Sequence, residues 1–217
     1  TYRAESSIQT CSICHKEQLT NAVCENSHFI CDACHSYGTY APVIAALRDS
    51  TEKDALLLLE KIMDLPSVHM HGPEHHAIVP CVLLTAFRNN GEHMDYDAAL
   101  SEICKRAKQV PGGTCGYWGV CGAAAGAGIF MSVMTGSSPL HKDAWPFPQK
   151  LVSIILSRLA DVGGPRCCKR TSRIAIEEAV HFYSQFCSVN IPLSSITCKY
   201  CEDNRECIQE DCPYYPE

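Results

Sequence analysis

The sequence predicts a mainly α-helical protein, a helical bundle core with small cysteine-rich metal-binding segments at both ends. Two observations favour this fold class. Apolar residues recur at helical spacing through the middle of the chain, and closely spaced cysteine pairs are concentrated towards its ends. We expect a zinc-ribbon or knuckle-like segment at residues 1–40, a helical core at residues 41–190 and a metal-binding tail at residues 191–217, with strands confined to the ends.

Composition excludes several classes of partner. The chain has 217 residues, enough for one sizeable hydrophobic core, and a formal net charge of −6. This acidic balance argues against nucleic-acid binding and against attraction to an anionic membrane. No apolar run reaches the roughly 18 residues of a membrane span, and the first residues lack a signal-peptide pattern. We expect a cytoplasmic protein.

Cysteine usage indicates metal binding. The chain contains 16 cysteines and 10 histidines, and many of the cysteines form CxxC pairs. Without an export signal, this pattern favours metal ligation in a reducing compartment over a disulfide framework. So many thiols suit an anaerobic organism.

The first candidate site lies near the N-terminus. Two CxxC turns can supply four thiolates to one tetrahedral ion, for which zinc is expected and a rubredoxin-like iron or disulfides are the alternatives. The predicted ligands are Cys11, Cys14, Cys31 and Cys34.

A further pair, Cys24 and His28, lies between these CxxC motifs. The order of ligands resembles the first six of a cross-braced RING-type zinc domain, in which the middle pair binds a second zinc. The last CxxC of such a domain does not follow directly. The nearest candidates are Cys198 and Cys201, far along the chain.

The core is predicted from helical periodicity. Residues 41–65 read as helical, with Pro42 in the first turn and a second helix start near Ser50. These segments are interpreted as scaffold. Further helices are expected at residues 95–109, 150–160 and 171–186, with a loop at residues 137–148.

A histidine-rich segment precedes a predicted helix that starts at Pro73 and runs to about Arg88. Such a helix start favours an anion, and histidines can ligate metal or transfer protons near pH 7. A helix cap with solvated side chains is the structural alternative. The candidate residues are His69, His71, Glu74, His75 and His76.

Residues 111–131, PGGTCGYWGVCGAAAGAGIFM, place Cys115 and Cys121 beside a run of glycine and alanine. Glycine costs a helix roughly 0.8–1.0 kcal/mol relative to alanine. Its use here indicates that a neighbouring helix, a metal cluster or a substrate approaches closely. The alternative is tight helix packing around two inert buried thiols.

Cys167 and Cys168 are adjacent and flanked by Arg166, Lys169 and Arg170. Positive neighbours are predicted to favour thiolates. Adjacent side chains point in different directions, so one cysteine can act as a ligand while the other packs.

The tail contains four cysteines in 15 residues and little else that could form a core. Zinc or an iron–sulfur cluster would supply the missing stability. The predicted ligands are Cys198, Cys201, Cys207 and Cys212.

The motifs MHGPEHH and PGGTCGYWGVCGAAAG, with CDACH and the tail, resemble an uncharacterised cysteine-rich family of anaerobic bacteria and archaea. Residues 80–186 are more distantly similar to the redox-associated C-GCAxxG-C-C family. That resemblance implies a helical fold with cysteines that bind iron–sulfur clusters. This chain departs from it by the adjacency of its last two cysteines and by the additional Cys115. The nominated ligands are Cys81, Cys121 and one or both of Cys167 and Cys168.

The leading functional hypothesis is an iron–sulfur enzyme of electron transfer, sulfur transfer or desulfuration. A [4Fe-4S] or [2Fe-2S] cluster on Cys81, Cys115, Cys121 and Cys167 or Cys168 would lie beside the histidine segment. The expected partners are a small or sulfur-containing substrate, an electron-transfer protein and a second copy of the chain. The alternatives are a zinc-stapled binding module without catalysis, and a catalytic zinc held by His75 or His76 with His69 or His71.

Overall fold

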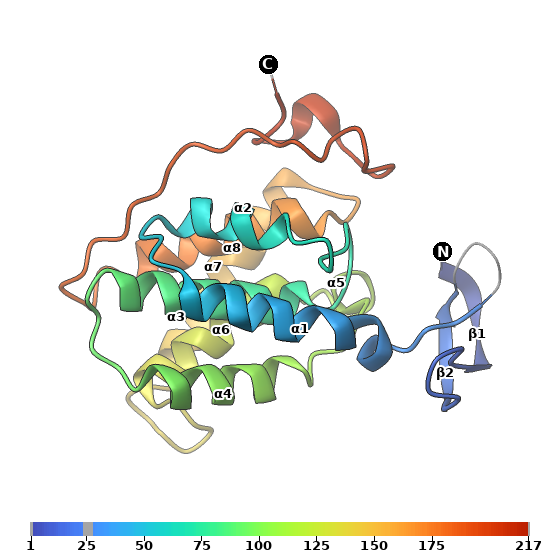
Figure 1. Cartoon of the computed structure of the whole chain (residues 1–217), viewed down its shortest axis with the longest axis horizontal. Helices are drawn as coiled ribbons and strands as arrows, with labels where there is room; N and C mark the ends of the chain where they lie inside the picture. The colour runs from blue at the N-terminus through green and yellow to red at the C-terminus, as the bar shows by residue number, and fades with distance from the viewer. Residues whose placement is uncertain (1, 24–27, 217) are drawn as a thin grey trace.

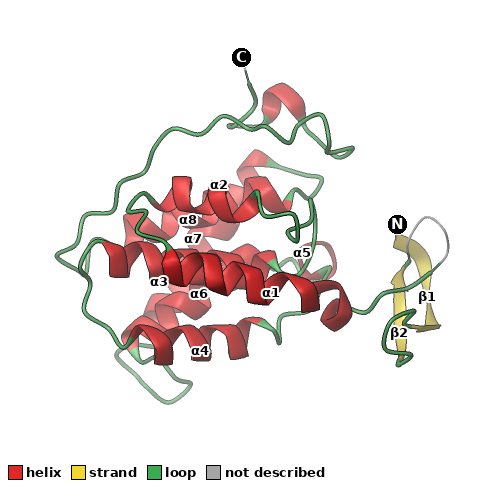
Figure 2. Cartoon of the chain, in the orientation of Figure 1, coloured by secondary structure: helices red, strands yellow, loops and turns green. Residues whose placement is uncertain are grey.

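The structure, a computed structural model, describes residues 2–23 and 28–216 and is mainly helical, which confirms the predicted fold class. Figures 1 and 2 show a two-stranded hairpin, a helical body and a long C-terminal segment. The elements are β1 (Tyr2–Thr10), β2 (Glu17–Ala22), α1 (Asp32–Asp49), α2 (Ala55–Met63), α3 (His75–Asn89), α4 (Tyr96–Ala107), α5 (Thr114–Tyr117), α6 (Gly122–Thr135), α7 (Pro146–Val162), α8 (Cys168–Tyr183) and the 3-10 turn η1 (Gln209–Asp211).

The N-terminal hairpin stands beside the helical body, at the start of α1 (Figure 1). Strands β1 and β2 pair antiparallel, and the facing residues Ile8 and Leu19 are both exposed. The Asn21 amide donates a hydrogen bond to the Tyr117 hydroxyl at 2.6 Å, which ties the hairpin to α5. An isolated two-stranded hairpin is marginally stable in water, so this segment needs a further source of stability.

Helix α3 is the centre of the body. Every residue from His75 to Phe87 is buried, as expected of a helix that packs on all sides. Helices α2, α4, α6 and α8 contact it, and α7 packs on α6 and α8. An aromatic group closes one end of the core, with Phe87, Phe130 and Tyr183 rings 4.8–5.5 Å apart between centroids.

The glycine-rich run forms α6, and a neighbouring helix accounts for it. A Cβ on Gly126 would lie 2.5 Å from the His76 carbonyl oxygen of α3, and one on Gly122 would lie 2.0 Å from the His76 ring. A larger residue at Gly126 would require a shift of the α3 backbone, and one at Gly122 would require the His76 ring to move. These glycines therefore bring α6 against the start of α3.

Helix α1 starts at Asp32, earlier than the predicted start near residue 41, and Pro42 lies inside it rather than in its first turn. Pro42 removes one backbone hydrogen bond. A buried face of the helix compensates, because Thr39, Val43 and Leu47 are all buried at four-residue spacing. Helix α1 spans the predicted boundary at residue 40. The division of the chain into three segments at residues 40 and 190 stays a prediction.

Helix α8 starts three residues before the predicted Thr171 because Cys167 caps it. The Arg170 N–H donates to the Cys167 Sγ at 3.4 Å. Helix α7 starts at Pro146, inside the predicted 137–148 loop, and proline is well suited to a first turn.

The chain after α8 runs over the helical body as an extended segment (Figure 1). The Ser194 N–H donates to the Asp54 carboxylate at 2.7 Å, and the Tyr214 hydroxyl donates to Glu177 at 2.9 Å. These contacts fix the tail across α2 and α8. In the described part of the chain, none of the helices combines the length and the apolar character needed to cross a membrane.

Candidate metal centres

The four N-terminal cysteines of the predicted tetrahedral site come together. The Sγ atoms of Cys11, Cys14, Cys31 and Cys34 all lie within 4.8 Å of one another. Backbone hydrogen bonds from Cys14 and Cys31 lower the pKa of Cys11 to about 6. Four sulfurs at this spacing can hold one ion. This site joins the end of β1 to the start of α1 and can stabilise the hairpin.

The middle pair of the RING-type pattern, Cys24 and His28, has no site of this kind in the described residues. Cys24 lies outside the described residues, and His28 is exposed. The structure therefore offers geometry for the four-cysteine site and leaves a second zinc at the middle pair as a prediction.

A second group consists of two histidines and a glutamate. Ligand atoms of His35, His69 and Glu74 lie within 4.8 Å of one another. The His69 Nδ1 is 3.0 Å from Glu74 Oε1, and the His35 Nδ1 is 3.7 Å from Glu74 Oε2. Burial raises the pKa of Glu74, but the facing His35 ring and smaller contributions from other neighbours outweigh it and lower the pKa to about 2. The buried carboxylate therefore stays ionised at neutral pH.

Sequence reasoning nominated His69 and Glu74 but missed His35. The residue directly follows Cys34 in the CDACH motif, so its proximity to a metal site was visible. Its contact with Glu74 was not, because the two residues are brought together only by the packing of α1 against residues 67–74.

The other predicted histidines separate into different environments. The His71 Nε2 lies 3.0 Å from both Asn204 Oδ1 and Glu206 Oε2 of the tail. His75 is fully buried, and burial together with the Lys169 charge lowers its pKa to about 4. His76 Nδ1–H donates to the Val110 carbonyl at 3.1 Å. Only His75 and His76 line the cavity that contains the core cysteines.

That cavity has a volume of about 440 Å³ and lies between α5, α6, α7 and the start of α8. Two parts of the chain that are far apart in sequence supply its thiols, one from α5 to the N-cap of α6 and the other at the start of α8. The predicted site residues that line it are Cys115, Cys121, Cys167, Cys168, His75 and His76.

Cys81 lies elsewhere, and this corrects the predicted ligand set. Its Sγ is 3.8 Å from the Cys104 Sγ, in the contact between α3 and α4. Five residues are about 1.4 turns of helix, so Cys81 points away from the side of α3 that carries His76. Cys104 of α4 is the neighbour of Cys81.

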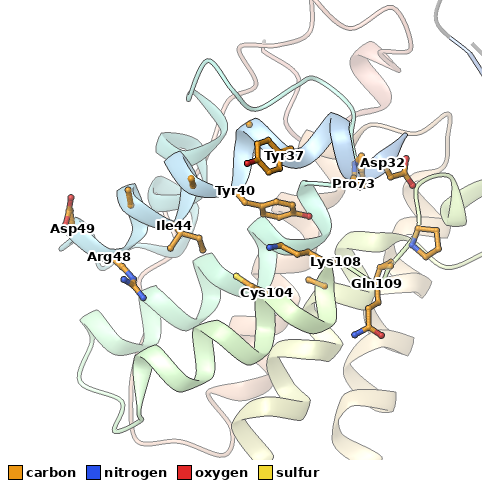
Figure 3. Close-up of a pocket in the computed structure, with 17 residues that line it drawn as sticks. Asp32, Tyr37, Tyr40, Ile44, Arg48, Asp49, Pro73, Cys104, Lys108 and Gln109 are labelled. Carbon is orange, nitrogen blue, oxygen red and sulfur yellow. The ribbon is translucent and has the colours of Figure 1, made fainter. Parts of the chain in front are cut away.

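Cys104 also lines a cavity of about 1300 Å³ between α1 and α4. Figure 3 shows Tyr40 of α1 above Lys108, with Cys104 one turn away on α4. The Lys108 Nζ lies 4.8 Å from the Tyr40 ring centroid. In the described residues, no group of three close metal-ligand atoms lies among the residues that line this cavity.

The prediction that basic neighbours favour thiolates at Cys167 and Cys168 is wrong for the metal-free protein. Burial raises the pKa of both thiols, that of Cys168 to about 12. The basic neighbours act in the predicted direction, since Arg170 lowers the pKa of Cys167 and Arg166 lowers that of Cys168, but the effect of burial is larger. A bound metal would have to displace these protons, as metals do at thiol ligands.

Part of the tail lies near the start of α8. Cys212 lines a small cavity together with Val162 and Gly164, and Gly164 is three residues before Cys167. Arg173 is fully buried beneath the tail and pairs with Glu60 at 2.7 Å. Within the described ranges, the tail sulfurs are not gathered as closely as those of the N-terminal site.

Comparison with known families gives one match. A model for a family of unknown function, DUF5714, matches residues 43–215. The chain belongs to this family. The DUF5714 region contains the core cavity, His69, Glu74 and the tail, whereas the N-terminal four-cysteine site and His35 precede it. Comparison with the curated proteins and with the solved structures found no match.

Proposed function

We propose that the protein is an iron–sulfur enzyme of redox or sulfur-handling metabolism, with its cluster on Cys115, Cys121 and Cys168. The observation that carries the proposal is their position on one cavity together with His75 and His76. The similarity to the C-GCAxxG-C-C family supports the same cofactor. The expected setting is the cytoplasm of an anaerobic organism, with an electron-transfer protein as redox partner.

The donor set fits such a cofactor. Thiolates are the usual ligands of iron–sulfur clusters, and they bind different irons, so they need not gather as closely as ligands of one ion. A cluster held by three thiolates would leave one iron free to bind a sulfur-containing substrate. Cys167 also lines the cavity. Cys168 is preferred as the ligand because the Cys167 Sγ already accepts the Arg170 N–H as the N-cap of α8.

The cavity also supplies a group that can move protons. Since a carbonyl can only accept, the His76 Nδ1 carries the proton that is donated to Val110. Burial lowers the pKa of His76, so the ring is neutral at pH 7 and its Nε2 is a proton acceptor. The ring edge that carries Nε2 lies against Gly122, beside Cys121. His76 is therefore placed to take a proton from a bound substrate.

The test is anaerobic purification of the wild type and of Cys121→Ala, followed by visible absorption spectroscopy. We expect a sulfur-to-iron absorption band in the wild type and its loss in the variant. Cys187→Ala is the matched control, because Cys187 is outside the cavity and contacts the Val189 carbonyl. A colourless wild type, or an unchanged band in Cys121→Ala, would overturn the proposal.

A zinc-stapled binding module without catalysis is the second candidate. The observation that favours it is the close gathering of the four N-terminal sulfurs, which suits a closed structural zinc site. This candidate requires a colourless protein that contains zinc, so the same purification separates the two functions.

A further inference from the structure

Glu74 is a buried anion whose polar atoms are only partly satisfied. Its side chain has no exposed surface. One oxygen, Oε1, accepts the His69 backbone N–H at 3.1 Å and also faces the His69 ring, but Oε2 has no hydrogen-bond partner. The His35 Nδ1 faces Oε2 at 3.7 Å and is buried and equally without a hydrogen-bond partner. A buried carboxylate is costly unless it is paired or binds a metal.

The spacing of these atoms suits a single ion. Ligands that lie 2.0–2.2 Å from one ion are roughly 3–4 Å from each other. The Glu74 oxygens are 3.0 Å from the His69 nitrogen and 3.7 Å from the His35 nitrogen. The second distance is too long for a hydrogen bond but short enough for two ligands of one metal.

We infer that His35, His69 and Glu74 bind one divalent transition-metal ion in a two-histidine, one-carboxylate site. The side chains of His35 and His69 are 32% and 48% exposed, so solvent reaches the edge of the site, while the His35 Nδ1 and the Glu74 Oε2 are themselves buried. Three protein ligands with open positions are typical of catalytic rather than structural metal sites. The open positions would bind water or an oxygen donor of a small molecule.

The fold holds each ligand in place. Gly72 permits the close approach of the chain to the carboxylate, because a Cβ there would lie 2.0 Å from Glu74 Oε2. The Thr39 hydroxyl, one turn after His35, donates a hydrogen bond to the Ser67 carbonyl at 2.6 Å. His35 also follows Cys34 of the four-cysteine site, so the two metal sites share the first turn of α1.

The site is distinct from the cluster of the proposed function. Its donors are nitrogen and oxygen, which suit zinc, iron, cobalt or nickel without sulfur. None of its three residues lines the core cavity. A measurement on one site can therefore fail while the other holds.

The test is a titration of the metal-depleted 217-residue chain with Co²⁺ under anaerobic, reducing conditions. Thiolate-bound cobalt gives intense charge-transfer absorption, whereas cobalt on nitrogen and oxygen gives only weak d–d bands. We expect Glu74→Gln and His69→Ala each to bind one Co²⁺ fewer per chain than the wild type, with charge-transfer absorption unchanged.

One control variant and the choice of a second test variant make the result decisive. His141→Ala changes a loop histidine whose Nδ1–H donates to the Gly136 carbonyl, and it should bind cobalt as the wild type does. His69→Ala guards against misfolding, since the His69 side chain is half exposed. Equal cobalt stoichiometry in wild type, Glu74→Gln and His69→Ala would overturn the inference. So would a variant that loses the thiolate charge-transfer band together with the cobalt.

Discussion

The His75 Nε2–H donates to the His69 carbonyl oxygen at 3.1 Å, and this hydrogen bond connects the two candidate centres. His69 belongs to the histidine–glutamate group, while His75 lines the core cavity. Burial lowers the pKa of His75 to about 4, so the ring is neutral at pH 7 and acts as a fixed donor. The two centres are therefore held in one orientation by the start of α3.

The N-terminal site should act as a structural staple. Cys11→Ser removes one of four sulfur ligands and should abolish zinc binding there. The hairpin has little core of its own, so it should lose stability together with the metal. We expect a lower melting temperature and reduced solubility, with any visible absorption of the core retained. Zinc analysis and thermal denaturation check this. Loss of the core absorption in a folded variant would show that the two regions share a cofactor.

The close contact of α6 with α3 should be intolerant of a single methyl group. Gly126→Ala places a Cβ 2.5 Å from the His76 carbonyl oxygen. This oxygen belongs to the helix backbone, which cannot easily move away. Overpacking of this kind costs about 1–3 kcal/mol, and each kcal/mol lowers the melting temperature of a chain of this size by about 2–4 °C.

Gly38→Ala is the matched control for that substitution. Gly38 lies in α1, and a Cβ there meets nothing within 4 Å. Alanine is the better helix former by about 1 kcal/mol, so this variant should be stabilised. Equal melting temperatures for the two variants would contradict the packing described here.

The tail should depend on a buried cation. Arg173 donates to both oxygens of Glu60, at 2.7 and 3.0 Å, and its guanidinium lies 5.3 Å from the Tyr214 ring centroid. Arg173→Ala leaves Glu60 unpaired, which should cost about 3–5 kcal/mol. Limited proteolysis should then cut residues 184–197 faster. Arg48→Ala, which breaks an exposed pair with Asp97, should cost less than about 1 kcal/mol and leave the cleavage rate unchanged.

Alkaline pH should destabilise the fold through Tyr183. Burial raises the pKa of this phenol from 10.0 to about 12. Between these values the unfolded chain releases the proton while the folded chain keeps it, so stability falls by about 1.4 kcal/mol per pH unit. Tyr183→Phe removes this contribution. Urea denaturation at pH 9 and pH 11 should show a smaller loss for the variant, and parallel losses would contradict the assignment.

The helices could be predicted from the sequence because their apolar periodicity reflects one core. The α1 start could not, since it depends on Cys31 and on the packing of Thr39, Val43 and Leu47 against other segments. The CxxC spacing correctly predicted that the four N-terminal cysteines come together, because each CxxC turn is a local structure. Contacts over longer separations were only partly predictable. The core cavity joins Cys121 and Cys168 as expected, but helical phase directs Cys81 to Cys104.

Basic residues near Cys168 illustrate a second limit of the sequence. Charge alone predicted thiolates, whereas burial proves the larger effect on the pKa of this thiol. His35 illustrates a third, because its approach to Glu74 depends on the packing of α1 beside the 67–74 segment. Burial and helix docking are properties of the folded chain, and the local pattern contains neither.

The most direct test of the proposed cluster is iron and acid-labile sulfide analysis of anaerobically purified wild type, Cys168→Ala and Cys81→Ala. We predict iron and sulfide in the wild type, their loss in Cys168→Ala, and their retention in Cys81→Ala, whose thiol faces Cys104 instead of the cavity. Absence of iron and sulfide from the wild type, or their loss in Cys81→Ala with retention in Cys168→Ala, would contradict the account.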